Sequence, residues 1–392
     1  MMNTNDVDNN MTMITQRMFT QAASGQMTVC EAVAFLEKQA RMRTLREKLE
    51  IYSHGCNLQE TLVSGLACHH PDINRDFFEK RVSGWLNNPA HQALNRKDAV
   101  ELCFILKLSL EEANAFVALV SEEGLHWRSP DEIVYIFALK QGMGYAEAQR
   151  LNEEMREILS NVEESKTFTE NSFTSVIRSE VSALGTKEEL ADYLRDAVSR
   201  LGRYHNNAYM LFMDMMESLE CPRLDADEER AEIFPSEKLT LGDILKEYLY
   251  EDNVLYARER MHDRCIKNRS FSEEDKFVFS VIQEKVSSGW PDEITLAKMK
   301  SRDVDVTRKV LILLFLATDP GPEEDLEMEP SRDEIFAELY QRLNDMLTQC
   351  GFMALDARSP FDWLVIYCIC VEDMLDVDAR MRAVFQEMFG ER

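Results

Sequence analysis

The sequence predicts an all-α protein, built as a multi-domain helical bundle. Glycine and proline are scarce, with 14 and 10 among 392 residues, about half of the roughly 12% that is usual. Apolar residues recur at the spacing i, i+3, i+4, i+7, as in Phe361, Leu364, Val365 and Cys368, whereas no long stretch alternates apolar and polar residues. With 45% apolar residues the chain can bury a sizeable core, so we expect packed helices throughout.

Helix starts are marked along the whole chain. Eight positions carry a capping side chain with an acidic residue three places later, which can reach back to the free backbone N–H groups of the first turn. These pairs are Asn95 with Asp98, Ser109 with Glu112, Ser129 with Glu132, Thr186 with Glu189, Thr240 with Asp243, Ser270 with Glu273, Ser331 with Glu334 and Ser359 with Asp362. Their distribution predicts helices from the first hundred residues to the last fifty.

Composition suggests two domain boundaries. Residues 160–172 are polar and aperiodic, and residues 221–238 combine two prolines with a run of acids, as linkers do. We therefore expect a helical bundle over 1–160, a long helical middle segment with an acidic linker over 161–235, and a C-terminal helical domain over 236–392.

The C-terminal domain is expected to surround one buried helix. Residues 360–372 are apolar on all sides, which is typical of a helix inside a core. We expect the ring of Trp363 in this helix to be enclosed by helices over 306–318 and 333–349.

A short repeat lies in the N-terminal part. Residues 98–107 align with 131–140, and residues 109–113 align with 144–148 after a two-residue insertion. Each unit is typical of a helix, a tight turn and a second helix, with Phe104 and Phe137 at equivalent core positions. We expect a compact bundle over 57–158.

The formal net charge is −27, which repels phosphates and anionic lipid and excludes a whole-surface nucleic-acid or membrane binder. Only residues 41–97 are basic, with nine positive and six negative side chains.

The nine cysteines are odd in number and lie mostly in apolar runs, which favours free thiols. The N-terminus lacks the order of a signal peptide and the longest aliphatic run has eight residues, so a cytoplasmic protein without a membrane anchor is expected.

The basic stretch contains a candidate DNA-binding helix. Phe78, Val82 and Trp85 form one apolar face of a short helix, a loop with Pro89 follows, and a second helix begins after Asn95. Over about 57–158 the sequence resembles the phage-repressor-type (XRE-like) helix-turn-helix proteins. The resemblance implies that the helix over 75–87 enters the major groove, and that double-stranded DNA is contacted through residues 75–97. The side chains it assigns to base or phosphate contacts are Lys80, Ser83 and Asn87, flanked by Arg75 and Arg81.

The C-terminal third is similar to uncharacterised helical proteins of anaerobic Firmicutes that are often encoded in mobile elements. The similar sequence segments are residues 311–319, 343–352 and 357–368. This resemblance implies a helical N-terminal domain of the kind just described and brings no catalytic chemistry.

Metal and catalytic signals are weak. His54, Cys56, Cys68, His69 and His70 concentrate potential ligands, but the paired spacing of a zinc site is absent, and the alternative is solvent-facing histidines beside core cysteines. No phosphate-binding loop and no nucleophile motif occurs, which leaves open a nucleophile assembled only by the fold. We expect no enzyme, no metal and no cofactor.

Two functions remain as hypotheses. In the first, a non-catalytic regulatory protein contacts DNA through its N-terminal bundle, while its acidic C-terminal domain binds protein or forms oligomers. In the second, an adaptor for phage defence or mobile-element control docks on a basic protein, or masks a nucleic-acid-binding partner, through its acidic face and does not bind DNA. Asp76 and Glu79 on the candidate helix and the strongly acidic residues 319–334 favour this alternative.

Overall fold

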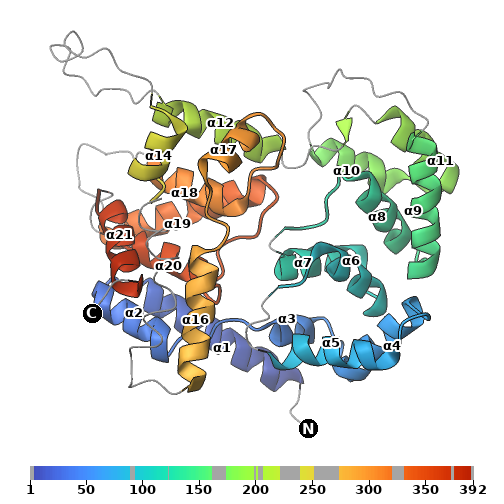
Figure 1. The fold of residues 1–392 in the computed structure, drawn as a ribbon, viewed down its shortest axis with the longest axis horizontal. Coiled ribbons are helices and arrows are strands. Elements are labelled where there is room, and N and C mark those ends of the chain that lie inside the picture. The colour runs from blue at the N-terminus through green and yellow to red at the C-terminus, as the bar shows by residue number, and fades with distance from the viewer. Residues whose placement is uncertain are drawn as a thin grey trace. The chain divides into compact units, whose positions relative to one another are not determined.

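The computed structural model describes residues 4–88, 93–121, 123–160, 174–197, 200–201, 206–220, 239–250, 273–319, 331–371 and 375–389. Across these ranges the regular elements are helices (Figure 1). The one extended pairing among the described residues is an isolated antiparallel bridge between Glu123 and Phe352. The predicted all-α class is confirmed, and no helix in the described ranges has the length and apolarity needed to cross a membrane.

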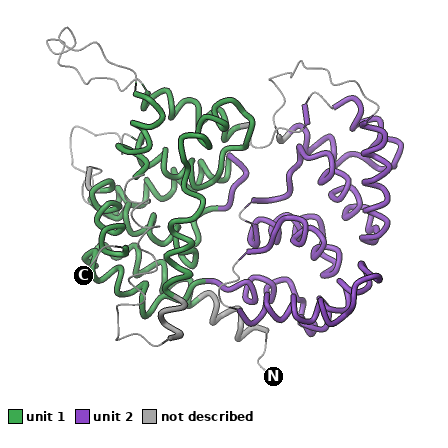
Figure 2. Tube along the Cα trace, viewed as in Figure 1, with its two compact units in different colours: residues 1–42, 207–349, 354–392 green, residues 43–206, 350–353 purple. Residues whose placement is uncertain are grey.

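The chain divides into two compact units (Figure 2). Unit 1 comprises residues 1–42, 207–349 and 354–392, and unit 2 comprises residues 43–206 and 350–353. These boundaries differ from the expected 1–160, 161–235 and 236–392, because the first two helices bury their apolar faces against helices from the C-terminal part of the chain. Of the linkers expected at 160–172 and 221–238, Ser160 is the last residue of α9, and residues 161–172 and 221–238 lie outside the described residues.

Unit 2 is an array of helical hairpins. Its helices are α3 (Leu45–Ile51), α4 (Leu58–His69), α5 (Arg75–Asn87), α6 (Arg96–Ile105), α7 (Leu110–Ser121), α8 (Pro130–Lys140), α9 (Tyr145–Ser160), α10 (Thr174–Ala183) and α11 (Lys187–Asp196). Three consecutive pairs, α4 with α5, α6 with α7 and α8 with α9, pack as hairpins, and α10 and α11 both pack on α8. Neighbouring hairpins contact each other through α4 and α6 and through α7 and α8. One hydrophobic core runs through the array from Leu45 to Leu201.

The internal repeat corresponds to the second and third hairpins. Both turns contain a residue with positive φ, Lys107 at 53° and Gly142 at 66°. After each of these residues the next N–H binds a carbonyl five residues back, at 3.0 and 2.9 Å, which is the Schellman ending of a helix. Phe137 is buried as expected, but Phe104 is only half-buried and packs against Tyr135 and Tyr145. The preceding pair of equivalent residues, Cys103 and Ile136, is buried in both repeats.

Unit 1 combines both ends of the chain. Its helices are α1 (Thr4–Ala22), α2 (Val29–Lys38), α12 (Asn206–Glu220), α14 (Leu241–Glu247), α16 (Glu273–Ser287), α17 (Glu293–Lys300), α18 (Arg308–Thr318), α19 (Arg332–Gln349), α20 (Pro360–Cys368) and α21 (Leu375–Phe389). Every residue of α20 is buried, as predicted, and this helix packs against α1, α16 and α21.

The surroundings of Trp363 differ from the prediction. The ring was expected between the helices over 306–318 and 333–349, but it stacks on Phe35 of α2, with ring centroids 5.4 Å apart. Its indole N–H donates to the backbone oxygen of Met18 in α1, at 3.0 Å. The apolar sequence of α20 predicts that the helix is buried, but it does not indicate which helices pack over it. In the structure, α1 and α2 from the N-terminal part of the chain contact Trp363.

Most of the predicted helix starts are confirmed. The six caps that bind the expected backbone N–H are Asn95, Ser109, Ser129, Thr186, Thr240 and Ser331. Ser270 lies outside the described residues. The pairing of Ser359 with Asp362 is wrong, because Ser359 makes no capping bond. Asp362 instead forms a buried ion pair with Arg308 of α18.

Candidate nucleic-acid interface

Helix α5, the predicted recognition helix, has a capping residue and an apolar face that can both be recognised in the sequence. The side chain of Asn74 accepts a hydrogen bond from the backbone N–H of Asp76 at 3.0 Å and so caps the first turn. Phe78, Val82 and Trp85 are buried on one face, as predicted, and this face packs against α3 and α4. The opposite side of α5 is therefore the side available for a partner.

Three of the five predicted contact residues lie on that side. Lys80 and Asn87 are exposed and Ser83 is partly exposed. The amide of Asn87 donates to the Ser83 hydroxyl at 3.0 Å. Between them, a side chain added at Gly84 would meet no atom within 4 Å. Lys80, Ser83 and Asn87 thus form one accessible polar stripe along the helix.

The two predicted arginines are engaged in ion pairs with other helices. The guanidinium of Arg75 lies 2.9 Å from Glu60 of α4 and 3.3 Å from Glu79. Arg81 pairs with Asp98 of α6, and its guanidinium lies 4.9 Å from the centre of the Trp85 ring. Asp98 is only 7% exposed, so the Arg81 charge compensates a carboxylate within the fold. The structure therefore does not bring all five predicted residues to one face.

The start of α5 carries exposed apolar and acidic side chains, which do not suit a contact with DNA phosphates. Phe77 is 54% exposed and Ile73, just before the helix, is 44% exposed. Asp76 and Glu79 are exposed in the same two turns. Within the predicted interface over 75–97, residues 89–92 lie outside the described part of the chain.

The predicted histidine and cysteine cluster does not converge on one point. His54 lies 3.6 Å from Glu112 of α7, and Cys56 and Cys68 are exposed. His69 and His70 instead meet Glu101 of α6. Among the described residues no group of three His, Cys, Asp or Glu side chains is arranged to hold a metal ion.

Glu101 is the polar residue that sequence reasoning missed. His69 Nδ1 and His70 Nε2 each lie 2.9 Å from the same oxygen, Oε1 of Glu101, and Glu101 is 2% exposed. Burial raises the pKa of Glu101, but the hydrogen bonds from the two imidazoles outweigh burial and hold this pKa below its usual value. The His69 ring also stacks on Tyr145 of α9, 4.5 Å away. This cluster ties the first hairpin to the second and third.

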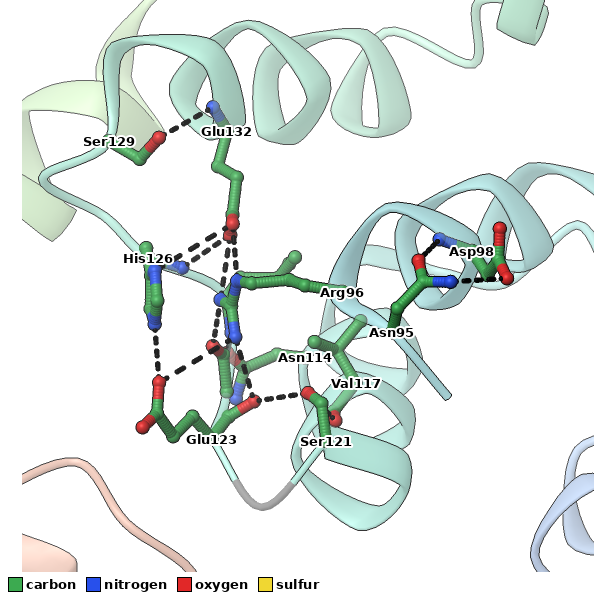
Figure 3. A network of polar contacts seen from close by, with 12 residues as sticks. Asn95, Arg96, Asp98, Asn114, Val117, Ser121, Glu123, His126, Ser129 and Glu132 are labelled. Carbon is green, nitrogen blue, oxygen red and sulfur yellow. Dashed lines mark hydrogen bonds and ion pairs between the residues drawn. The ribbon is translucent and has the colours of Figure 1, made fainter. Parts of the chain in front are cut away.

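A second polar network joins α6 to α8 (Figure 3). Arg96 donates to Glu132 at 2.8 Å and to the backbone oxygen of Gly124 at 2.5 Å. Glu132 also accepts the backbone N–H of His126 at 2.7 Å, and the His126 ring lies 2.8 Å from Glu123. The charged groups bind one another and the backbone, so the network fixes the segment between α7 and α8.

The predicted acidic interaction segment, residues 319–334, is described only at its ends, since 320–330 lie outside the described ranges. Asp319 pairs with Arg342 at 2.8 Å, and Glu334 accepts from the backbone of Ser331 at the start of α19. These two carboxylates therefore have structural partners.

Comparison of the chain with family models, with curated proteins and with solved structures finds no match. The functional interpretation therefore depends on the geometry of the two units.

Proposed function

We propose that this chain is a cytoplasmic, non-catalytic regulatory protein that acts by binding another protein through unit 2. The observation that carries the proposal is the array of three successive hairpins on one continuous core. Stacked helical hairpins create extended surfaces that suit protein partners. The ion pair of Arg81 with the buried Asp98 favours this function over DNA binding, because it commits one of the two predicted arginines to a partner within the fold.

The exposed apolar residues at the start of α5 are the best candidates for the contact. Large aromatic side chains are enriched where protein interfaces gain most of their binding energy. Phe77 and Ile73 are exposed four residues apart in the sequence, with the exposed Arg75 between them. The acidic charge is concentrated elsewhere: unit 1 has 25 Lys and Arg against 45 Asp and Glu, and unit 2 has 19 against 26.

A quantitative pull-down from the native host tests the proposal. The partner retained by the wild-type chain should be lost with Phe77→Ser. It should be retained with Ile294→Ser, which alters a 68% exposed isoleucine of unit 1. Equal retention by both variants would exclude the start of α5 as the contact surface.

DNA contact through α5 is a second candidate, and the stripe of Lys80, Ser83 and Asn87 favours it. Binding to a duplex should weaken steeply with salt, and Lys80→Ala should weaken it alike for all sequences and lower the salt slope by about 1. Lys246→Ala, which removes an exposed cation of α14 in unit 1, is the matched control. No binding to any duplex at low salt leaves protein binding alone.

A further inference from the structure

The N-terminal arm, defined here as residues 1–42, is held in unit 1 through its own backbone oxygens. Side chains in α20 and on both sides of it donate to main-chain carbonyls of the arm. These bonds are Trp363 to Met18 at 3.0 Å, Tyr367 to Met27 at 3.0 Å, Cys370 to Ala23 at 3.2 Å, and Arg358 to Arg41 at 3.0 Å and to Met42 at 3.4 Å. The donors follow one another along 358–370, so one short segment binds the arm at several points between Met18 and Met42.

Aromatic side chains also pack between the N-terminal arm and α20. Trp363 is fully buried, with Phe35 of the arm stacked on one side at 5.4 Å and Tyr367 nearby at 5.8 Å. Phe35 is itself only 5% exposed. A buried aromatic pair of this kind contributes beyond the area that it buries, so the arm and α20 share one core.

The turn between α1 and α2 is shaped to approach this unit closely. Gly25 has φ of 61°, and a Cβ atom built there would lie 2.5 Å from the guanidinium of Arg332 in α19. The positive φ favours glycine at this position, since a residue with a Cβ atom is strained there.

The arm is joined to the rest of the chain by a single link. Residues 40–44 are not helical, and the chain passes from unit 1 to unit 2 between Met42 and Arg43. The arm is nearly neutral, with three basic and four acidic residues, whereas unit 1 as a whole has a net charge of −20. The contact between the arm and the acidic remainder of unit 1 therefore involves little electrostatic repulsion.

We propose that α20 and its flanking residues form a docking groove for the N-terminal arm, and that the arm of a second copy of this chain can replace the resident one. Replacement conserves every hydrogen bond described above, since each joins the arm to the remainder of unit 1. Because Arg358 binds the carbonyls of Arg41 and Met42, only the chain just after Met42 changes its course, as in domain swapping. The balance between the resident arm and the arm of a second copy then depends on protein concentration and on the link.

The test uses the full chain with a site-specific protease sequence inserted between Met42 and Arg43. After cleavage, a labelled synthetic peptide of residues 1–42 is added, and its uptake is followed by fluorescence anisotropy. The labelled arm should replace the resident arm under conditions in which circular dichroism shows that the remainder stays folded. A synthetic peptide of residues 130–160, the α8/α9 hairpin, should not enter.

Two matched variants show whether the groove donors hold the arm. Trp363→Phe keeps a ring but removes the N–H that binds Met18, and it should speed release of the labelled arm about tenfold. Trp290→Phe removes a comparable donor of unit 1, which binds the backbone of Leu249 at 2.6 Å, and it should leave release unchanged. The proposal is overturned if the arm enters only when unit 1 unfolds, if the 130–160 peptide enters equally well, or if both variants speed release alike.

Discussion

Removing one charge from the buried pair of Arg308 and Asp362 should severely weaken unit 1. The two side chains are 9% and 4% exposed and make two parallel hydrogen bonds of 2.7 and 2.8 Å. Asp362 also accepts the backbone N–H of Asp356 at 2.9 Å. Asp362→Asn keeps an acceptor for that N–H but leaves the guanidinium buried without its counter-charge.

The expected loss for such a change is about 3–5 kcal/mol, a large part of the roughly 5–15 kcal/mol that stabilises a domain. The double variant Arg308→Met/Asp362→Asn should recover most of this loss, because no buried charge then remains uncompensated. The matched control is Asp378→Asn, which breaks a pair with Arg382 that is 53% and 32% exposed. The control should cost only about 0–1 kcal/mol.

Hydrogen exchange of the slowest amides in α20 measures the unfolding free energy of unit 1 separately from unit 2. The reasoning fails if Asp362→Asn costs no more than Asp378→Asn. It also fails if the double variant is less stable than Asp362→Asn alone, since the two residues would then not compensate each other.

Three further predictions concern single residues. Lys107→Gly should raise the urea unfolding free energy of unit 2 by about 1 kcal/mol, because Lys107 occupies a left-handed conformation; a loss would contradict this. The pKa of Glu101 is lowered, so its carboxylate should stabilise unit 2 above about pH 4.3, the usual pKa of a glutamate. This contribution should vanish as the pH falls through the lowered pKa of Glu101. Glu101→Gln should therefore flatten the acid limb of a curve of unfolding free energy against pH, and an unchanged limb would exclude the effect. Burial raises the pKa of Cys368 to about 12, so this thiol should resist iodoacetamide in the native chain while exposed Cys30 reacts; equal labelling by mass spectrometry would contradict this.

The candidate site shows how far sequence reasoning could go. The burial of Phe78, Val82 and Trp85 follows from spacing within a single helix, and it placed Lys80, Ser83 and Asn87 on the opposite side correctly. Arg75 pairs with Glu79 one turn away, but its other partner, Glu60, and the partner of Arg81 lie 15 and 17 residues away along the chain, on other helices. No local pattern reveals such pairs, so their engagement became visible only in the structure.

What the sequence determined by itself is local: which segments are helices, where six of the caps lie, and that the segment 360–372 is buried, as its described residues 360–371 are. These properties depend on residues within one or two turns of each other, whose geometry the helix itself sets. Tertiary structure decided which faces meet. Asp362 fits a helix cap in sequence, yet it binds Arg308, 54 residues away. Trp363 is covered by α1 and α2, more than 300 residues away, because an apolar face is satisfied by any complementary surface and only the folded chain selects one.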